Sequence, residues 1–154
     1  MKQSFKLFNF QGAPVYLSFW FFLLFLLFSI ETTVGIFISV LIHEMAHAWM
    51  ANRKGYNVYG ITIDAFSGAA AIDANMHDRD SIPITAAGPI STLMLAVVSY
   101  LTNTFCPNEF LHSMFIINTY LCEVNNNSHE RKNSNSISMY FLYLYFNPYR
   151  MWIL

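Results

Sequence analysis

The chain has 154 residues, of which 55% are hydrophobic and only 11% are charged. A soluble domain carries roughly 25% charged residues, so this composition excludes a disordered chain and argues against an ordinary soluble domain. Eight Lys and Arg residues against nine Asp and Glu residues leave no basic excess for a phosphate backbone, so we expect no nucleic-acid partner. Two cysteines, Cys106 and Cys122, are too few for a disulfide scaffold. The expected surroundings of the chain are a lipid bilayer.

The first long apolar run extends from Val15 to Ile30 and contains no charge, glycine or proline. With its flanks it is just long enough to cross a hydrocarbon core of about 30 Å. No small-x-small cleavage site follows it, since the next residues are Glu31 and Thr32. We therefore predict a retained transmembrane helix rather than a cleaved signal peptide.

The second apolar run, Thr33 to Ala51, predicts another transmembrane helix, paired with the first as a tight hairpin through Glu31 and its neighbours. Gly55 is expected to cap its C-terminal end. Basic residues lie before the first run and after the second, at Lys2, Lys6, Arg53 and Lys54. The positive-inside rule then places the N-terminus in the cytoplasm, in a multi-pass integral membrane protein.

Residues 56–82 are less apolar and predict one or two short strands and a loop at the membrane interface, including Val58–Ile63. A third apolar run from Pro83 to Leu101 predicts a transmembrane helix. Its small residues allow close helix packing, and Pro89 is expected to kink or start the helix. The resulting fold class is an all-α membrane protein with about three transmembrane helices and a short β-hairpin between the second and third.

The composition changes near Leu121. A fourth apolar piece, Phe110 to Leu121, is too short to span a membrane. Residues 123–138 are rich in Asn and Ser, which is typical of an exposed loop, and Met139 to Leu154 is an aromatic segment that suits a membrane edge. We therefore divide the chain into a membrane core, residues 1–121, and a divergent tail, residues 122–154.

The chemistry is concentrated in the second run, where His43, Glu44 and His47 form the motif H-E-x-x-H. Positions i and i+4 share one face of a helix, so both imidazoles can reach one metal ion. Zinc suits two imidazoles, a third protein ligand and a water. Glu44 can accept a proton from that water and pass it to the leaving amine of a cleaved peptide bond.

Three other interpretations of the motif fit the sequence less well than a metal site. The two histidines could simply pack in a helix interface, but an isolated Glu in an apolar helix would be costly. Axial haem ligation needs histidines on opposite sides of the iron, which neighbours on one helix face cannot supply. A soluble metalloprotease would carry the motif on an amphipathic helix, whereas this helix is apolar all round.

An H-E-x-x-H motif within a transmembrane helix resembles the site-2 protease family of intramembrane zinc metalloproteases. The resemblance covers about residues 9–121. It includes the entry to the first helix at residues 12–19, the catalytic helix at residues 41–48, a strand hairpin at residues 57–71, and Ala-Gly-Pro at residues 87–89, which opens the third helix. It implies that His43 and His47 bind zinc, that Glu44 is the catalytic residue, and that the substrate is a membrane-spanning protein.

The sequence departs from the family pattern at the third zinc ligand, which the family takes from an Asp-Gly motif on a later helix. Residues 117–121 are similar to the approach to that motif, but no Asp occurs after Asp80. A truncation or frameshift just after Leu121 would produce this pattern. The alternative function is therefore a catalytically degenerate membrane protein with a binding or regulatory role.

For several further residues the sequence allows two alternative roles. Glu123, His112 and His129 are possible substitutes for the third ligand, and Asp64 could approach the site but is more typical of a solvated turn. Gly68 and its small neighbours either form an edge to which a substrate adds as a strand or a plain re-entrant hairpin. The resemblance implies that Asn118 contacts substrate or a water near the metal, while helix packing is the simpler role. The acidic residues around His77 are expected to form a solvated loop rather than a second metal site.

Overall fold

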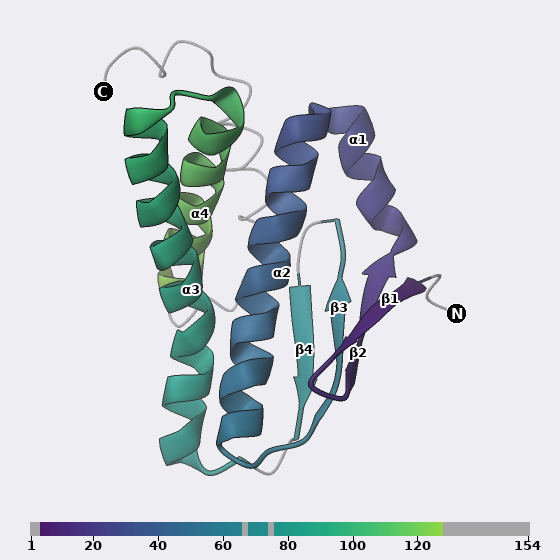
Figure 1. Ribbon diagram of the computed structural model, residues 1–154. Helices are drawn as coiled ribbons and strands as arrows, with labels where there is room; N and C mark the ends of the chain where they lie inside the picture. Colours follow the sequence, from purple (N-terminus) through teal and green to yellow (C-terminus); the bar gives the residue numbers. More distant parts are fainter. Residues whose placement is uncertain (1–3, 66–67, 74–75, 128–154) are drawn as a thin grey trace.

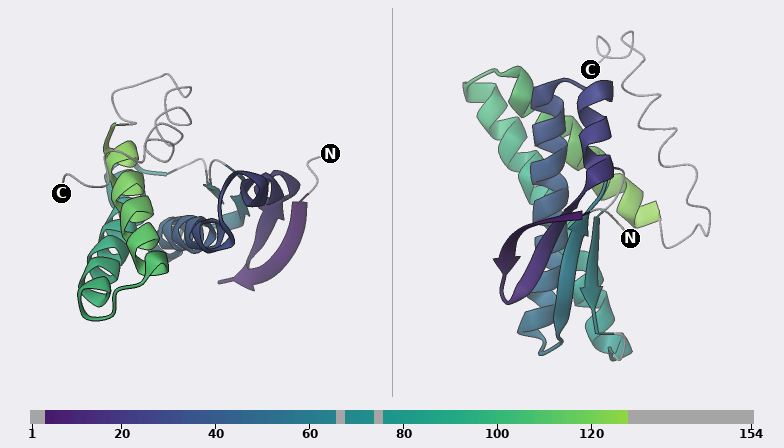
Figure 2. Two further views of the ribbon diagram at one scale, coloured as in Figure 1. Left: turned by 90° about the horizontal axis from the view of Figure 1, so that it is seen from above. Right: turned by 90° about the vertical axis from the view of Figure 1, so that its right-hand side faces the viewer.

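The computed structural model describes residues 4–65, 68–73 and 76–127, with side chains up to residue 121 except that of residue 120. A long central helix, α2 (Ile30–Arg53), contacts helices α3 and α4 as well as strands β3 and β4. Figure 1 shows α3 and α4 on one side of α2 and the small sheet on the other, and Figure 2 shows the same arrangement from two further directions. The central helix is therefore covered from both sides.

The central helix α2 has 24 residues and begins after Ser29, whose side chain accepts a hydrogen bond from the backbone N–H of Thr32. This is the usual N-terminal cap of a helix. The helix ends at Arg53, and Gly55 follows with a φ of +86°, a left-handed conformation that glycine adopts without strain. The second apolar run thus forms a helix as expected, with Gly55 at its C-terminal end.

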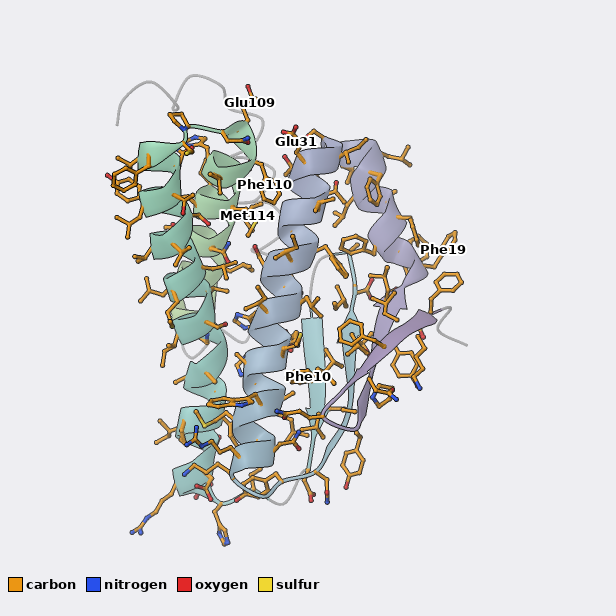
Figure 3. The ribbon with its side chains drawn as sticks, viewed as in Figure 1. Phe10, Phe19, Glu31, Glu109, Phe110 and Met114 are labelled. Atoms are coloured by element: carbon orange, nitrogen blue, oxygen red, sulfur yellow. The ribbon has the colours of Figure 1, made fainter. Side chains whose placement is uncertain are left out.

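Helix α3 (Asp78–Phe105) and helix α4 (Glu109–Asn127) complete the helical layer. Pro89 neither starts nor ends α3, because the helix begins eleven residues before it, and Pro83 also lies within it. In Figure 3, Glu31 near the start of α2 and Glu109 at the start of α4 lie at the same end of the molecule, so these two helices run in the same direction. Along this contact Gly35 of α2 faces Met114 of α4.

The sheet has four strands in the order β1-β2-β3-β4: β1 (Ser4–Phe10), β2 (Ala13–Ser18), β3 (Val58–Ile63) and β4 (Gly68–Ile72). Two antiparallel hairpins, β1-β2 and β3-β4, are joined by parallel pairing of β2 with β3, with Val15 opposite Ile61. The hairpin expected between the second and third apolar runs is therefore present. The N-terminal hairpin was not predicted.

The prediction that Val15 to Ile30 forms one transmembrane helix is wrong. Its first residues belong to β2, and they are followed by a 3-10 helix, η1 (Phe19–Leu23), and the four-residue helix α1 (Leu24–Leu27). The turn into α2 lies at Phe28 and Ser29, so Glu31 belongs to the first turn of α2 rather than to the loop. The physical reason is the pairing of β2 with β3, which buries Val15, Ile61 and Ile63 completely.

Among the described residues, two helices are long and apolar enough to cross a membrane by length and composition, namely α2 and α3. The expected count of three spans is thus not confirmed, and the described residues contain two candidates together with a small four-stranded sheet in a mostly helical fold. Helix α4 has 19 residues and continues past the expected end at Leu121 to Asn127, so residues 123–127, which were predicted to lie in an exposed loop, are helical. The Asn-rich and aromatic parts of the predicted tail, from residue 128 onward, lie outside the described residues.

Candidate metal centre and catalytic glutamate

The two histidines of the motif converge on one point. On α2 the Nε2 atoms of His43 and His47 lie 3.1 Å apart. Two imidazole nitrogens bound to one tetrahedral zinc at about 2.05 Å would be roughly 3.3 Å apart. The helix therefore presents both nitrogen atoms at the separation that a shared zinc ion requires, as the i, i+4 spacing predicted.

The ring of His47 is oriented by helix α3. Its Nδ1 atom lies 2.7 Å from the carbonyl oxygen of Ile84. Since a carbonyl only accepts, Nδ1 carries the proton and donates it, which leaves the lone pair of Nε2 for a metal. Ile84 is buried, so this contact is held in place by the packing of α3 against α2.

Glu44 lies on the sheet side of α2. It is only 7% exposed, and its carboxylate accepts a hydrogen bond from the backbone N–H of Ala70 in β4. A buried carboxylate is costly unless it is paired or hydrogen-bonded. The edge of the sheet thus holds the side chain that the motif identifies as the proton acceptor, one position along α2 from His43.

Two glycines leave the space in front of these side chains open. A β-carbon at Gly68 would lie 2.5 Å from Glu44 Oε1, and a β-carbon at Gly88 would lie 2.6 Å from His43 Nε2 and would also collide with His47 Nε2. Because neither distance is compatible with a real β-carbon, only glycine fits at these positions unless the side chains move. The Nε2 atoms of both histidines and the Glu44 carboxylate therefore border space that the methyl group of an alanine would fill.

The sequence had pointed to both glycines for other reasons. Gly88 is one of several small residues predicted to let helices pack closely, and Gly68 is predicted to lie either at a strand edge or in a plain re-entrant hairpin. Gly68 does begin β4, which in the described sheet has β3 as its neighbour. Contact with the histidines and Glu44 could not be predicted, since it depends on how α3 and β4 fold back onto α2.

A third ligand is not found among the described side chains, which contain no group of three His, Cys, Asp or Glu residues placed to hold a metal. The carboxylate of Asp64 accepts a hydrogen bond from the backbone N–H of Ala65 at 2.8 Å, as a turn residue does. His112 is exposed in the first turns of α4. Glu123 and His129 lie outside the described side chains.

Two remaining predicted residues have packing roles. Asn118 is completely buried between α4 and α2, where its Nδ2 atom donates to Ser39 Oγ at 2.9 Å and to the carbonyl oxygen of Met114 at 2.8 Å. The backbone N–H of His77 donates to the hydroxyl of Tyr56, whose own proton goes to Asp80, so this group links the ends of α2 and α3. The helix-packing interpretation of Asn118 matches these contacts.

Comparisons with known proteins identify the family of the chain. A model of peptidase family M50 matches residues 31–142. A zinc metalloprotease of Methanocaldococcus jannaschii is 26% identical over 117 residues, which are 68% of this chain and 34% of that protein. The chain thus spans about a third of the length of this curated relative.

The fold also has a counterpart among solved structures. A site-2 protease from Methanocaldococcus jannaschii superimposes with a TM-score of 0.72 at 21% sequence identity, covering 93% of this chain and 73% of that one. This likeness shows the fold, and the family match covers well over half of the chain, including the whole H-E-x-x-H motif. The chain therefore belongs to peptidase family M50, the membrane-embedded family of the site-2 proteases.

Proposed function

We propose that this chain is an intramembrane zinc metalloendopeptidase that hydrolyses peptide bonds of membrane-spanning proteins. The observation that carries the proposal is the convergence of His43 Nε2 and His47 Nε2 to 3.1 Å, with the buried Glu44 following His43 on the same helix. Membership of a metalloprotease family supports it. The oriented Nδ1 of His47 supports it further, because a fixed tautomer is what a ligating histidine needs.

Each residue has a defined task in this proposal. His43 and His47 would hold the zinc through their Nε2 atoms. Bound there, zinc would supply Lewis-acid activation of a water molecule and of the substrate carbonyl. Glu44 would accept the proton of that water and return it to the amine of the broken peptide bond. Burial of the site by α3 and the sheet limits competing access of bulk water.

The substrate would reach the site as an extended strand along β4. A helical substrate segment must lose its internal hydrogen bonds before it can be cleaved, and a strand edge supplies replacements for them. The first residue of β4, Gly68, lies against Glu44, so a strand paired there would pass the catalytic side chain. The backbone of β4 would then align the peptide bond with the zinc.

The proposal includes a topology. The two candidate spans, α2 and α3, meet at the end of the molecule that carries Arg53 and Lys54. We propose that this end faces the cytoplasm, as the positive-inside rule predicts, and that the N-terminus lies on the same side of the bilayer. The partners of the chain are then lipid and a membrane-protein substrate, with no role for nucleic acid.

A second candidate function is a catalytically degenerate relative that binds membrane proteins without cutting them. The described side chains offer two zinc ligands, His43 and His47, and no third. Two histidines alone would hold zinc weakly. The two functions differ in whether the purified chain cleaves a membrane-spanning substrate, and the absence of bound zinc would also favour the degenerate function.

The test compares the purified chain with Glu44→Gln in detergent or liposomes. Zinc content is measured by elemental analysis, and cleavage is measured on a single-pass membrane substrate. We expect both proteins to contain zinc and only the unmodified chain to cleave, with a loss of about 10²- to 10⁴-fold in Glu44→Gln. Equal cleavage by both proteins would exclude Glu44 as the catalytic residue, and zinc without cleavage in either would favour the degenerate function.

Histidine variants provide a matched control for the metal. His43→Gln is expected to lose zinc, whereas His112→Gln removes an exposed imidazole from α4 and is expected to retain it. If both variants kept the zinc of the unmodified chain, the metal would lie elsewhere. If both lost it, His112 would belong to the metal site.

A further inference from the structure

Two buried polar atoms close to the site lack a partner within the described part of the chain. They are Nδ1 of His43 on α2 and Oδ1 of Asn118 on α4. A buried polar group without a hydrogen bond is costly, so native proteins contain few of them. One arrangement that gives both atoms a hydrogen bond would explain why they are buried.

The orientation of the Asn118 amide is fixed by its other contacts. Its Nδ2 atom lies 2.8 Å from the carbonyl oxygen of Met114, an atom that can only accept a hydrogen bond. Turning the amide over would place two oxygen atoms against each other at that position. Both N–H bonds of Asn118 are used, on Met114 and Ser39, and Oδ1 is left as a buried acceptor.

His43 needs a hydrogen-bond acceptor, whereas Asn118 has an unused one. A neutral imidazole carries one N–H, and a histidine that binds a metal through Nε2 must carry that proton on Nδ1. In His47 the equivalent N–H donates to the carbonyl oxygen of Ile84. His43 has the same need for an acceptor, because its Nδ1 is buried as well.

Asn118 and His43 have Ser39 as a common neighbour. Ser39, the partner of Asn118, precedes His43 by four residues and so lies on the same face of α2, one turn or about 6 Å away. Two hydrogen bonds of roughly 2.8 Å through one water join atoms up to about 5.6 Å apart, so the bridge requires the side chains of Asn118 and His43 to extend toward each other. Buried waters commonly satisfy such pairs of otherwise unpaired groups.

We propose that Asn118 is a positioning residue for the metal centre, which accepts the Nδ1 proton of His43 through one buried water and so fixes the tautomer that presents Nε2 to zinc. The inference rests on the proposed zinc site. It assigns Asn118 to the metal ligand rather than to the substrate, because both of its donors are already occupied. Helix α4 would thereby act on His43 as helix α3 acts on His47.

The test replaces the amide by an apolar side chain of similar shape, Asn118→Leu, and measures two properties. The first is zinc affinity by competition with a chelator, which we expect to fall about 10- to 100-fold. The second is the tautomer of His43 in the zinc-free protein, read from ¹⁵N chemical shifts of the imidazole. We expect the Nδ1–H form in the unmodified chain and a shift toward the Nε2–H form in Asn118→Leu.

Two controls separate positioning from general loss of packing. Ser39→Ala removes the hydrogen bond that ties Asn118 to α2 but keeps Oδ1, and Thr33→Val removes a buried hydrogen bond to the carbonyl oxygen of Leu24 elsewhere on α2. Both are expected to lower the melting temperature while zinc affinity stays within about two-fold, well short of the 10-fold change expected for Asn118→Leu. A loss of zinc affinity in Ser39→Ala as large as in Asn118→Leu would overturn the proposal.

An unchanged His43 tautomer together with unchanged zinc affinity in Asn118→Leu would also overturn it. Should Asn118→Leu fail to fold, Asn118→Ser, which is smaller and polar, takes its place with the same expected shift in the tautomer. If the unmodified chain binds no zinc, the proposed function fails, whereas the tautomer measurement on the zinc-free protein still decides the role of Asn118.

Discussion

A β-carbon at Gly88 would collide with the Nε2 atom of His47, the atom that would bind the proposed zinc. It would also lie 2.6 Å from Nε2 of His43. We therefore expect Gly88→Ala to lower zinc affinity at least 10-fold, because the added methyl group occupies the position where the two ligands meet. The measurement is zinc retention by the purified variant during dialysis against a chelator.

The control for Gly88 is Gly60→Ala on β3. A β-carbon there would lie 3.4 Å from the carbonyl oxygen of Pro14 and would approach no side chain of the metal centre. We expect this variant to retain zinc. Normal zinc binding by Gly88→Ala would show that the histidines ligate in another geometry.

Gly68→Ala should separate metal binding from catalysis. A β-carbon at this position would lie 2.5 Å from Glu44 Oε1 and 2.7 Å from Glu44 Cδ, so the carboxylate has to move. Neither histidine is among the atoms that this methyl group would meet. We expect cleavage to fall by 10²-fold or more, in the range for a displaced general base, while zinc content is unchanged.

The comparison that checks this is Gly68→Ala against Gly88→Ala, with zinc content and cleavage measured on the same preparations. The first variant is expected to be inactive with zinc and the second to be inactive without it. If Gly68→Ala also lost zinc, Glu44 would be acting as a metal ligand or a support for the histidines, and its assigned role would be wrong.

The proposed topology predicts that Lys54 and Cys106 lie on opposite sides of the membrane. Lys54 follows the end of α2, and Cys106, which is exposed, follows the far end of α3. In intact inverted vesicles carrying Cys122→Ser, a membrane-impermeant thiol reagent should label Lys54→Cys and leave Cys106 unlabelled until detergent is added. Labelling of both positions from one side would mean that α2 and α3 do not both cross the bilayer.

Local sequence patterns predicted the parts of the site that lie on one helix. The i, i+4 spacing brings His43 and His47 together, and Gly55 has the backbone conformation expected at a helix end. The strands near Val58–Ile63 were also recognisable from their alternating pattern and the turn residues around them. These features depend on neighbours within a few residues.

The features that were missed depend on contacts between distant parts of the chain. Val15 lies in a run that is apolar enough for a membrane helix, and only its pairing with Ile61 makes that segment a strand. The carbonyl oxygen of Ile84 and the amide of Ala70 are backbone groups, so no side chain in the sequence could indicate that they hold His47 and Glu44. The open space at Gly88 likewise exists only because α3 packs against α2.

The hydrogen bond between Glu44 and the backbone of Ala70 has a consequence for how a substrate would start the reaction. A peptide that pairs with β4 at this position would need the same N–H for its own carbonyl oxygen. Binding of the peptide would then release the Glu44 carboxylate toward the zinc, and departure of the product would return it to Ala70. In the proposed protease, the Glu44 carboxylate would thus be free to accept a proton only while a peptide strand is paired with β4.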